Sequence, residues 1–346
     1  MADRPEVAVV VGAYGRERFL LPAVRSVLAQ TLPRERYEIV VTKNFTSPEV
    51  DRFLEENRVV VLRDDEARVG TWLLHAVAAT QAPYIAFLDD DDEFEPDRLA
   101  HVLAVLRSDP TIGFYRNRVC VIDEQGNPIP PAAWRSHEVD AFFDAHGPVS
   151  VRANEKSHLG ELGLERTRVS FNSSTMVVRR ELFDGELGAA FGRVRLSPDI
   201  ALFVIAALGP YSLYLDDRRL TRYRYYAGGV THRISWLHQV SEGYAELAST
   251  ANRHGNTDVA RRLSAESEHY DRLFRSGTIV EKVGAGAERR EVARLAEEYL
   301  RFLGRHPAER ALTLDVWAAE VYATSYLVAP GVARRVSLRQ AARRRP

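Results

Sequence analysis

The sequence predicts an α/β protein with a mainly parallel, Rossmann-like sheet and flanking helices, followed by an all-helical C-terminal region. Short, continuous apolar runs alternate with amphipathic segments in the first part of the chain, and the spacing leaves room for one helix between successive strands. Strand patterns stop near residue 236, and only helical periodicities follow.

The first part of the chain reads as four strand–helix pairs. Leu20, Val24, Val27 and Leu28 mark one helix face, and Ser47-Pro48 is typical of a helix start. The expected strands are 7–11, 37–41, 58–62 and 83–88. The expected helices are 20–28, one from 48, 71–80 and 96–108.

The pattern becomes less regular after residue 110. Strands are expected at 113–122, 169–179, 211–215 and 220–226, with a short apolar helix at 200–208. Further helices are expected at 236–254, 257–275, 287–304 and 312–327. We therefore divide the chain into an α/β domain at 1–235, a helical region at 236–330 and a basic tail at 331–346. The tail is expected to be disordered, with a weak contact to an anionic membrane surface as the alternative.

Composition excludes several classes of protein. The formal net charge of −1 gives no general attraction to nucleic acid. Cys120 is the single cysteine, which rules out intrachain disulfides and thiolate zinc sites. No apolar run approaches the roughly 20 residues of a membrane span, and no signal peptide is recognisable. We expect a cytoplasmic protein.

Five consecutive acids, Asp89 to Glu93, follow the expected strand at 83–88. Open α/β sheets bind their ligands at the carboxyl ends of the strands, and adjacent carboxylates repel one another unless a cation neutralises them. A hard divalent metal with oxygen ligands would do so. The same run also suits an acidic loop that caps the next helix. Neither a G-x-G-x-x-G fingerprint nor a Walker A sequence is present, so hydride transfer and nucleotide hydrolysis have no motif in support.

Three motifs in their order along the chain give a more specific indication: Ser26-Val-Leu-Ala-Gln30-Thr31, Tyr84-Ile-Ala-Phe-Leu-Asp-Asp-Asp-Asp92 and Leu220-Thr-Arg-Tyr223-Arg224. Over about residues 6–235 the chain resembles the family 2 glycosyltransferases, which have the GT-A fold. The resemblance implies a metal-dependent inverting transfer of a sugar from a nucleotide-diphosphate sugar, UDP-linked by expectation, to an acceptor hydroxyl. It implies Mn²⁺ or Mg²⁺ as cofactor.

The resemblance also assigns roles to residues. Asp91 would bind the metal, and Asp199 would be the catalytic base. Ser197-Pro198-Asp199 also suits an ordinary helix start, whose dipole would lower the pKa of the acid and keep it ionised, so the two interpretations are compatible. The residues expected to bind the nucleotide-sugar are Ala13, Tyr14, Arg16, Asn44, Asp89, Asp90 and Arg224. Asn172, Ser173 and Ser174 are expected on the acceptor side, with strand-edge hydrogen bonding as an equal alternative.

The sequence departs from the family at the nucleotide base. Where the family has two acids after the second strand, this chain has Lys43 and Asn44; Lys43 could reach a phosphate and Asn44 a base edge. A dTDP- or GDP-linked donor and a catalytically degenerate nucleotide-sugar-binding protein are therefore kept as alternatives. The acceptor could be a glycan, a lipid-linked compound or a small molecule, and a homodimer is a further expectation; nucleic acid is not expected.

Overall fold

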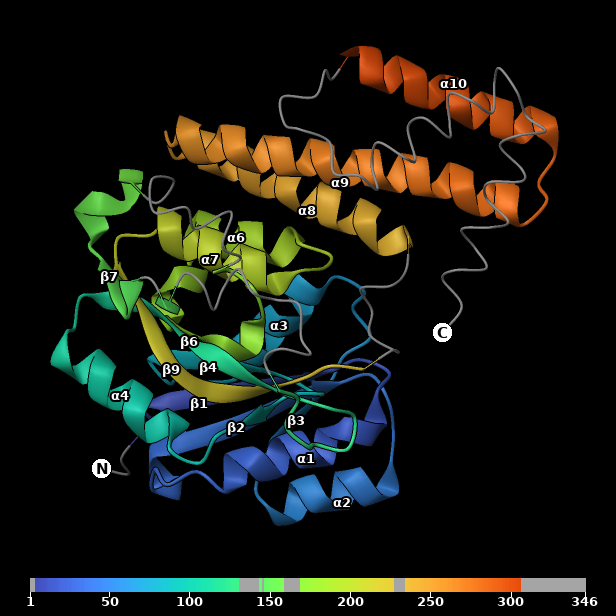
Figure 1. The fold of residues 1–346 in the computed structure, drawn as a ribbon. Helices are drawn as coiled ribbons and strands as arrows, with labels where there is room; N and C mark the ends of the chain where they lie inside the picture. The colour runs from blue at the N-terminus through green and yellow to red at the C-terminus, as the bar shows by residue number, and fades with distance from the viewer. Residues whose placement is uncertain (1–3, 131–142, 145, 159–168, 227–233, 306–346) are drawn as a thin grey trace. The chain divides into compact units, whose positions relative to one another are not determined.

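The computed structural model describes residues 4–130, 143–144, 146–158, 169–226 and 234–305. The chain forms two compact units, one made of residues 1–229 and 249–259 and the other of residues 230–248 and 260–346. The first unit contains the sheet, and the described part of the second is helical (Figure 1).

A single mixed sheet lies at the centre of the first unit. In the described residues it has nine strands, in the order β3-β2-β1-β4-β8-β6-β9-β5, with β7 paired to β9. The strands are β1 (Val7–Ala13), β2 (Tyr37–Lys43), β3 (Val60–Arg63), β4 (Tyr84–Asp89), β5 (Glu93–Phe94), β6 (Ile112–Ile122), β7 (Val149–Val151), β8 (Met176–Arg179) and β9 (Ser212–Arg224).

The first four strands of this order are parallel, as the sequence predicts. β1 is buried on both faces, because Val9 and Val10 point to opposite sides and neither is exposed. The register places Gly12 of β1 beside Asp89 of β4. The carboxyl ends of these two strands therefore lie at the same edge of the sheet, where the glycine-containing loop after β1 meets the acidic run after β4.

Helices cover both faces of the sheet (Figure 1). They are α1 (Glu17–Leu28), α2 (Pro48–Glu56), α3 (Val69–Ala78), α4 (Arg98–Ser108), α6 (Gly185–Arg193) and α7 (Pro198–Leu208). Apolar side chains of α1, α2 and α4 form one core with the inward face of β1 and β2. On the other face Phe87 of β4 contacts Phe191 of α6, with ring centroids 6.5 Å apart.

The second half of the sheet is mixed, because β6 and β9 pair in parallel while β8 runs the other way. β8 is antiparallel to both of its neighbours, β4 and β6. β8 is also shorter than the expected strand at 169–179. Asn172 has a positive φ of 68°, and a 3-10 turn at Ser173–Thr175 follows it, so the strand begins only after this turn. An antiparallel strand begins where its parallel-sheet neighbour ends, so this turn lies at the carboxyl end of β4. The two strands expected at 211–215 and 220–226 are one strand, β9, whose pairing to β6 shifts register.

Three helices form the C-terminal region: α8 (Ile234–Arg253), α9 (Thr257–Gly284) and α10 (Arg289–Arg305). Within the second unit, Tyr244 of α8 stacks on Tyr270 of α9 with ring centroids 5.5 Å apart, and the Ser241 hydroxyl donates to the Ser267 carbonyl at 2.9 Å. The expected helix at 312–327 and the basic tail at 331–346 lie outside the described residues. Among the described helices, none combines the length and the apolar character that crossing a membrane requires.

Candidate active site

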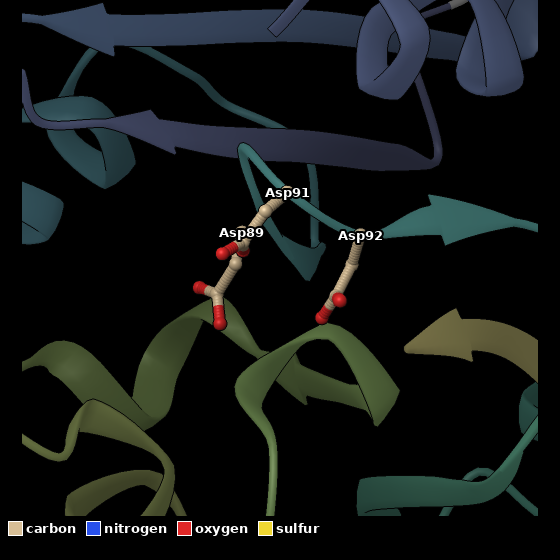
Figure 2. Close-up of side chains that lie close together, drawn as sticks. All are labelled: Asp89, Asp91 and Asp92. Carbon is tan, nitrogen blue, oxygen red and sulfur yellow. The ribbon is translucent and has the colours of Figure 1, made fainter. Parts of the chain in front are cut away.

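The acidic run forms a tight turn at the carboxyl end of β4. Asp89 is the last residue of the strand, and the Asp92 amide donates to the Asp89 carbonyl at 3.1 Å. The turn gathers the carboxylates of Asp89, Asp91 and Asp92, whose nearest oxygens all lie within 4.8 Å of one another (Figure 2). Asp89 and Asp91 come together because the chain turns after Asp89, and not through alternation along an extended strand.

Asp92 is the most deeply held of these acids and is 1% exposed. Its Oδ2 accepts hydrogen bonds from Asn172 Nδ2 at 2.8 Å and from the Ser174 hydroxyl at 2.7 Å, and its Oδ1 accepts from the Arg224 amide at 2.9 Å. Burial raises the pKa of Asp92 well above its ordinary value, and the neighbouring Asp91 and Asp89 add to the effect. Asp92 therefore anchors the surrounding backbone, a role that the sequence prediction missed.

The turn at residues 172–174 holds the acids from the opposite side. The Ser173 hydroxyl donates to Asp89 Oδ1 at 2.9 Å, and the Asp89 amide donates to the Ser174 hydroxyl at 3.0 Å. The backbone N–H of Asn172 donates to Asp199 Oδ2 at 3.1 Å. One short turn thus bonds Asp89, Asp92 and Asp199, so all three residues expected on the acceptor side are in the same network as the acidic turn.

Asp199 lies in the first turn of α7, and its carboxylate also accepts the Ile200 amide at 2.9 Å. Burial raises the pKa of Asp199 from 3.8 to about 6, despite the backbone hydrogen bonds that oppose the shift. The expectation that the helix start would lower this pKa is therefore wrong, because desolvation outweighs the favourable backbone contacts. A carboxylate with this pKa is a competent proton acceptor near neutral pH.

Arg16 closes the acidic turn from the loop after β1. Its Nη1 donates to Asp91 Oδ2 at 2.5 Å and to the Tyr226 hydroxyl at 3.1 Å, and its Nη2 forms an ion pair with Asp90. The Tyr226 hydroxyl in turn donates to Asp91 Oδ2 at 3.0 Å. Asp90 is fully buried, and burial raises its pKa well above the ordinary value even though Arg16 opposes the shift.

Arg224 supports the turn from β9. Its Nε donates to the Asp91 carbonyl at 2.8 Å, and its guanidinium also forms an ion pair with Glu93 and bonds the Asp123 and Glu124 carbonyls. The side chain is 3% exposed. Arg224 is expected to bind the nucleotide-sugar; in the structure its guanidinium is paired with the Glu93 carboxylate.

The residues expected around the nucleotide base lie beside the same edge. Tyr14 is 48% exposed and contacts Trp72 edge-on at 5.9 Å between centroids, while Asn44 Oδ1 accepts the Gly15 amide at 2.6 Å. Ala13 is buried at the end of β1 and is 0% exposed. Lys43 is fully buried, with its Nζ 2.6 Å from Asp51 Oδ1 and from the Phe45 carbonyl. Its ammonium is thus bound within the protein and not presented to a phosphate.

A buried arginine behind the 172–174 turn is a further supporting residue. Arg98 Nη2 donates to the Ser174 carbonyl at 3.0 Å, and Nε donates to Asn117 Oδ1 at 3.1 Å. Its guanidinium lies 3.8 Å from the centroid of the Phe94 ring, and burial lowers its pKa from 12.5 to about 9. In the sequence Arg98 stands at an expected helix start, where arginine is usually exposed, and nothing in the neighbouring residues indicates that it is buried.

The described residues fit a hard divalent cation. Oδ1 of Asp91 and Oδ2 of Asp89 accept no hydrogen bond from the described residues, so each acid has one oxygen to offer, and carboxylate oxygens are the ligands such cations prefer. Asp92, the third member of the group, already accepts three hydrogen bonds. Asp89 and Asp91 are therefore the better placed ligands.

Comparison with known proteins agrees with this arrangement. The family model for glycosyl transferase family 2 matches residues 8–184. The chain belongs to glycosyl transferase family 2. An uncharacterized glycosyltransferase of Methanocaldococcus jannaschii is 26% identical over 151 residues, which make up 41% of this chain and 52% of the relative. The match to this curated relative thus spans about half of its length.

Solved structures show the same fold as this family 2 chain at low sequence identity. Staphylococcus aureus TarS 1–349 in complex with UDP-GlcNAc has a TM-score of 0.58 at 12% identity, with 93% of this chain and 92% of TarS covered. The mannosyltransferase PcManGT of Pyrobaculum calidifontis, in complex with GDP-Man and Mn²⁺, has a TM-score of 0.51 at 16% identity, with 95% and 88% covered. The predicted family and GT-A fold with a helical C-terminal region are confirmed.

Proposed function

We propose that this family 2 chain is a metal-dependent inverting glycosyltransferase that moves a sugar from a UDP-linked donor to an acceptor hydroxyl. The observation that carries the proposal is the turn at residues 172–174, which bonds both the metal-binding side of the site, through Asp89 and Asp92, and the proton acceptor Asp199. A displacement at the anomeric carbon needs these two functions next to each other.

On the donor side, Asp91 and Asp89 would hold Mn²⁺ or Mg²⁺. A divalent ion bound there would stabilise the negative charge that develops on the leaving nucleoside diphosphate. Arg16 adds a positive charge at the same edge, and Tyr14 exposes a ring on which a nucleobase could stack. Uracil is proposed because TarS binds UDP and UDP-GlcNAc in this fold. A GDP-linked donor is the alternative that PcManGT supports.

On the acceptor side, Asp199 would remove the proton of the attacking hydroxyl. Its raised pKa gives it more basicity than an ordinary carboxylate while it stays largely ionised above pH 6. The attack forms one bond between the acceptor oxygen and the anomeric carbon as the bond to the diphosphate breaks, which inverts the configuration. Asn172 fixes the carboxylate through its backbone amide and keeps one oxygen of Asp199 in place.

Release of nucleoside diphosphate from UDP-sugars, followed with and without Mn²⁺, tests this function. Asp91→Ala should lose Mn²⁺-dependent UDP binding and turnover, whereas Asp199→Asn should keep donor binding and lose transfer by orders of magnitude. Asp97→Asn, a change at an acid that is 54% exposed on the segment leading into α4, is the matched control and should behave like the wild type. Mn²⁺-dependent UDP binding that survives Asp91→Ala would disprove the metal assignment. Donor binding without any release by the wild type would instead support a degenerate binding protein.

A further inference from the structure

Arg16 already neutralises the carboxylate on which the metal would depend. Its Nη1 and the Tyr226 hydroxyl both bond Asp91 Oδ2, and its Nη2 pairs with the buried Asp90. Among the described residues, Arg16 is the one whose ion pairs reach both Asp90 and Asp91. The acidic turn is therefore held in shape by a cation of the protein itself.

A metal ion and this guanidinium would lie too close to bind Asp91 independently. A metal on Oδ1 would be about 5 Å from a guanidinium on Oδ2, given metal–oxygen distances of roughly 2.1 Å. Even with the dielectric constant of water, a divalent and a monovalent cation at about this distance repel by enough to weaken metal binding roughly tenfold. The two cations thus compete for Asp91 unless further negative charge arrives.

A diphosphate would supply that charge, and Arg16 is placed to receive it. Its side chain is 31% exposed, whereas Asp90 beside it is fully buried, so the guanidinium has room to move and the carboxylate does not. Arg16 lies directly before Glu17, the first residue of α1, where helix amides favour anions. Guanidinium groups bind phosphate oxygens as readily as carboxylates.

We propose that Arg16 is a positioning residue that couples metal binding to diphosphate binding. In the ligand-free protein it holds Asp91 and opposes the metal; when a nucleoside diphosphate binds, Arg16 shifts towards the phosphates and the metal gains full access to Asp91. The inference rests on the proposed metal-dependent function and adds a coupling between the two ligands. The metal alone binds weakly, and the metal together with the diphosphate binds tightly. Linkage requires that the metal strengthen diphosphate binding by the same factor.

Mn²⁺ titrations followed by the electron paramagnetic resonance signal of free Mn²⁺ test the coupling without any turnover. Each protein is titrated with Mn²⁺ alone, with Mn²⁺ and UDP, and with Mn²⁺ and pyrophosphate as a probe that carries no base. The wild type should bind Mn²⁺ at least tenfold more tightly when the diphosphate is present. Arg16→Gln should bind Mn²⁺ alone roughly tenfold more tightly than the wild type, and the diphosphate should then improve Mn²⁺ binding by a correspondingly smaller factor.

Two further variants separate charge from structure. Arg16→Lys keeps the positive charge and should keep weak binding of Mn²⁺ alone. Arg18→Gln, a change at a side chain 61% exposed and two residues further along the chain, should match the wild type in every titration. A merely structural role for Arg16 would weaken Mn²⁺ binding in the glutamine variant, so equal or weaker binding of Mn²⁺ alone overturns the inference. Failure of the wild type to bind Mn²⁺ with either diphosphate would overturn the proposed metal dependence and, with it, this inference.

Discussion

Replacing Arg98 by methionine should leave the stability of the protein nearly unchanged while it weakens the active site. Methionine is similar in length and remains able to pack on the Phe94 ring that the guanidinium now covers. The substitution removes a buried charge together with its hydrogen bonds to Ser174 and Asn117. Removing the buried charge stabilises the folded state, and removing the hydrogen bonds destabilises it. The change in the free energy of unfolding is the difference between these two contributions.

The two contributions are of similar size. Burial lowers the pKa of Arg98 from 12.5 to about 9, and at about 1.4 kcal/mol per pKa unit the charge costs the folded state about 5 kcal/mol. This cost is present in full at any pH well below 9, because the side chain is then charged in both the folded and the unfolded protein. Two hydrogen bonds from a charged donor return about 3–6 kcal/mol. We therefore expect the free energy of unfolding to change by less than about 2 kcal/mol.

Function should respond differently, because the Ser174 carbonyl loses one of its two donors and keeps the Thr221 hydroxyl at 3.1 Å. Loosening this turn should weaken Mn²⁺–UDP binding about fivefold to tenfold, the equivalent of one hydrogen bond. Urea unfolding at neutral pH and calorimetric titration measure the two effects. Arg107→Met, the same change at a 56% exposed position of α4, is the control and should alter neither. A loss of more than about 4 kcal/mol, or unchanged Mn²⁺–UDP affinity, would refute the reasoning.

Three further outcomes follow from the structure. In its proposed role as the base, Asp199 must be ionised, and burial raises its pKa to about 6. The rate of transfer should therefore fall about tenfold per pH unit below that value, as a pH–rate profile at saturating donor will show. Asn172→Ala should be less stable in thermal unfolding than Asn172→Gly by about 1 kcal/mol, because both lose the bond to Asp92 but only glycine adopts a φ of 68° without strain. Gly70→Ala should lower the melting temperature strongly, since the added Cβ would lie 1.9 Å from the Phe191 carbonyl oxygen; unchanged melting would contradict this close approach.

The parallel part of the fold is predictable from local sequence. The apolar runs of β1 and β4 are continuous because both faces of each strand are buried, and continuity is a property that a single segment displays. Once the two strands are taken as parallel neighbours, their carboxyl ends must meet at one edge. The meeting of Arg16 with Asp90 and Asp91 follows from that placement.

The remaining features of the site depend on contacts that no local pattern contains. The segment at 169–179 is rich in β-formers, but its direction is set by pairing with β4 and β6, whose partners are distant in the sequence. The positive φ of Asn172 shortens the strand and creates the turn that bonds Asp92. Arg98 is distinguished from Arg107 on the same helix only by what packs over it. The sequence therefore indicates which acids form the site better than it indicates the turn and the buried arginine that hold them in place.

The shared turn at residues 172–174 has a consequence for altering the enzyme. Ser173 and Asn172 contact acids for which we propose different substrates, Asp89 on the donor side and Asp199 on the acceptor side. A laboratory selection for new acceptors that changes these positions would also disturb donor binding. Variants with a new acceptor preference would then bind the nucleotide-sugar donor more weakly. Libraries aimed at acceptor choice should therefore leave this turn intact and vary side chains that make no bond to the acidic cluster.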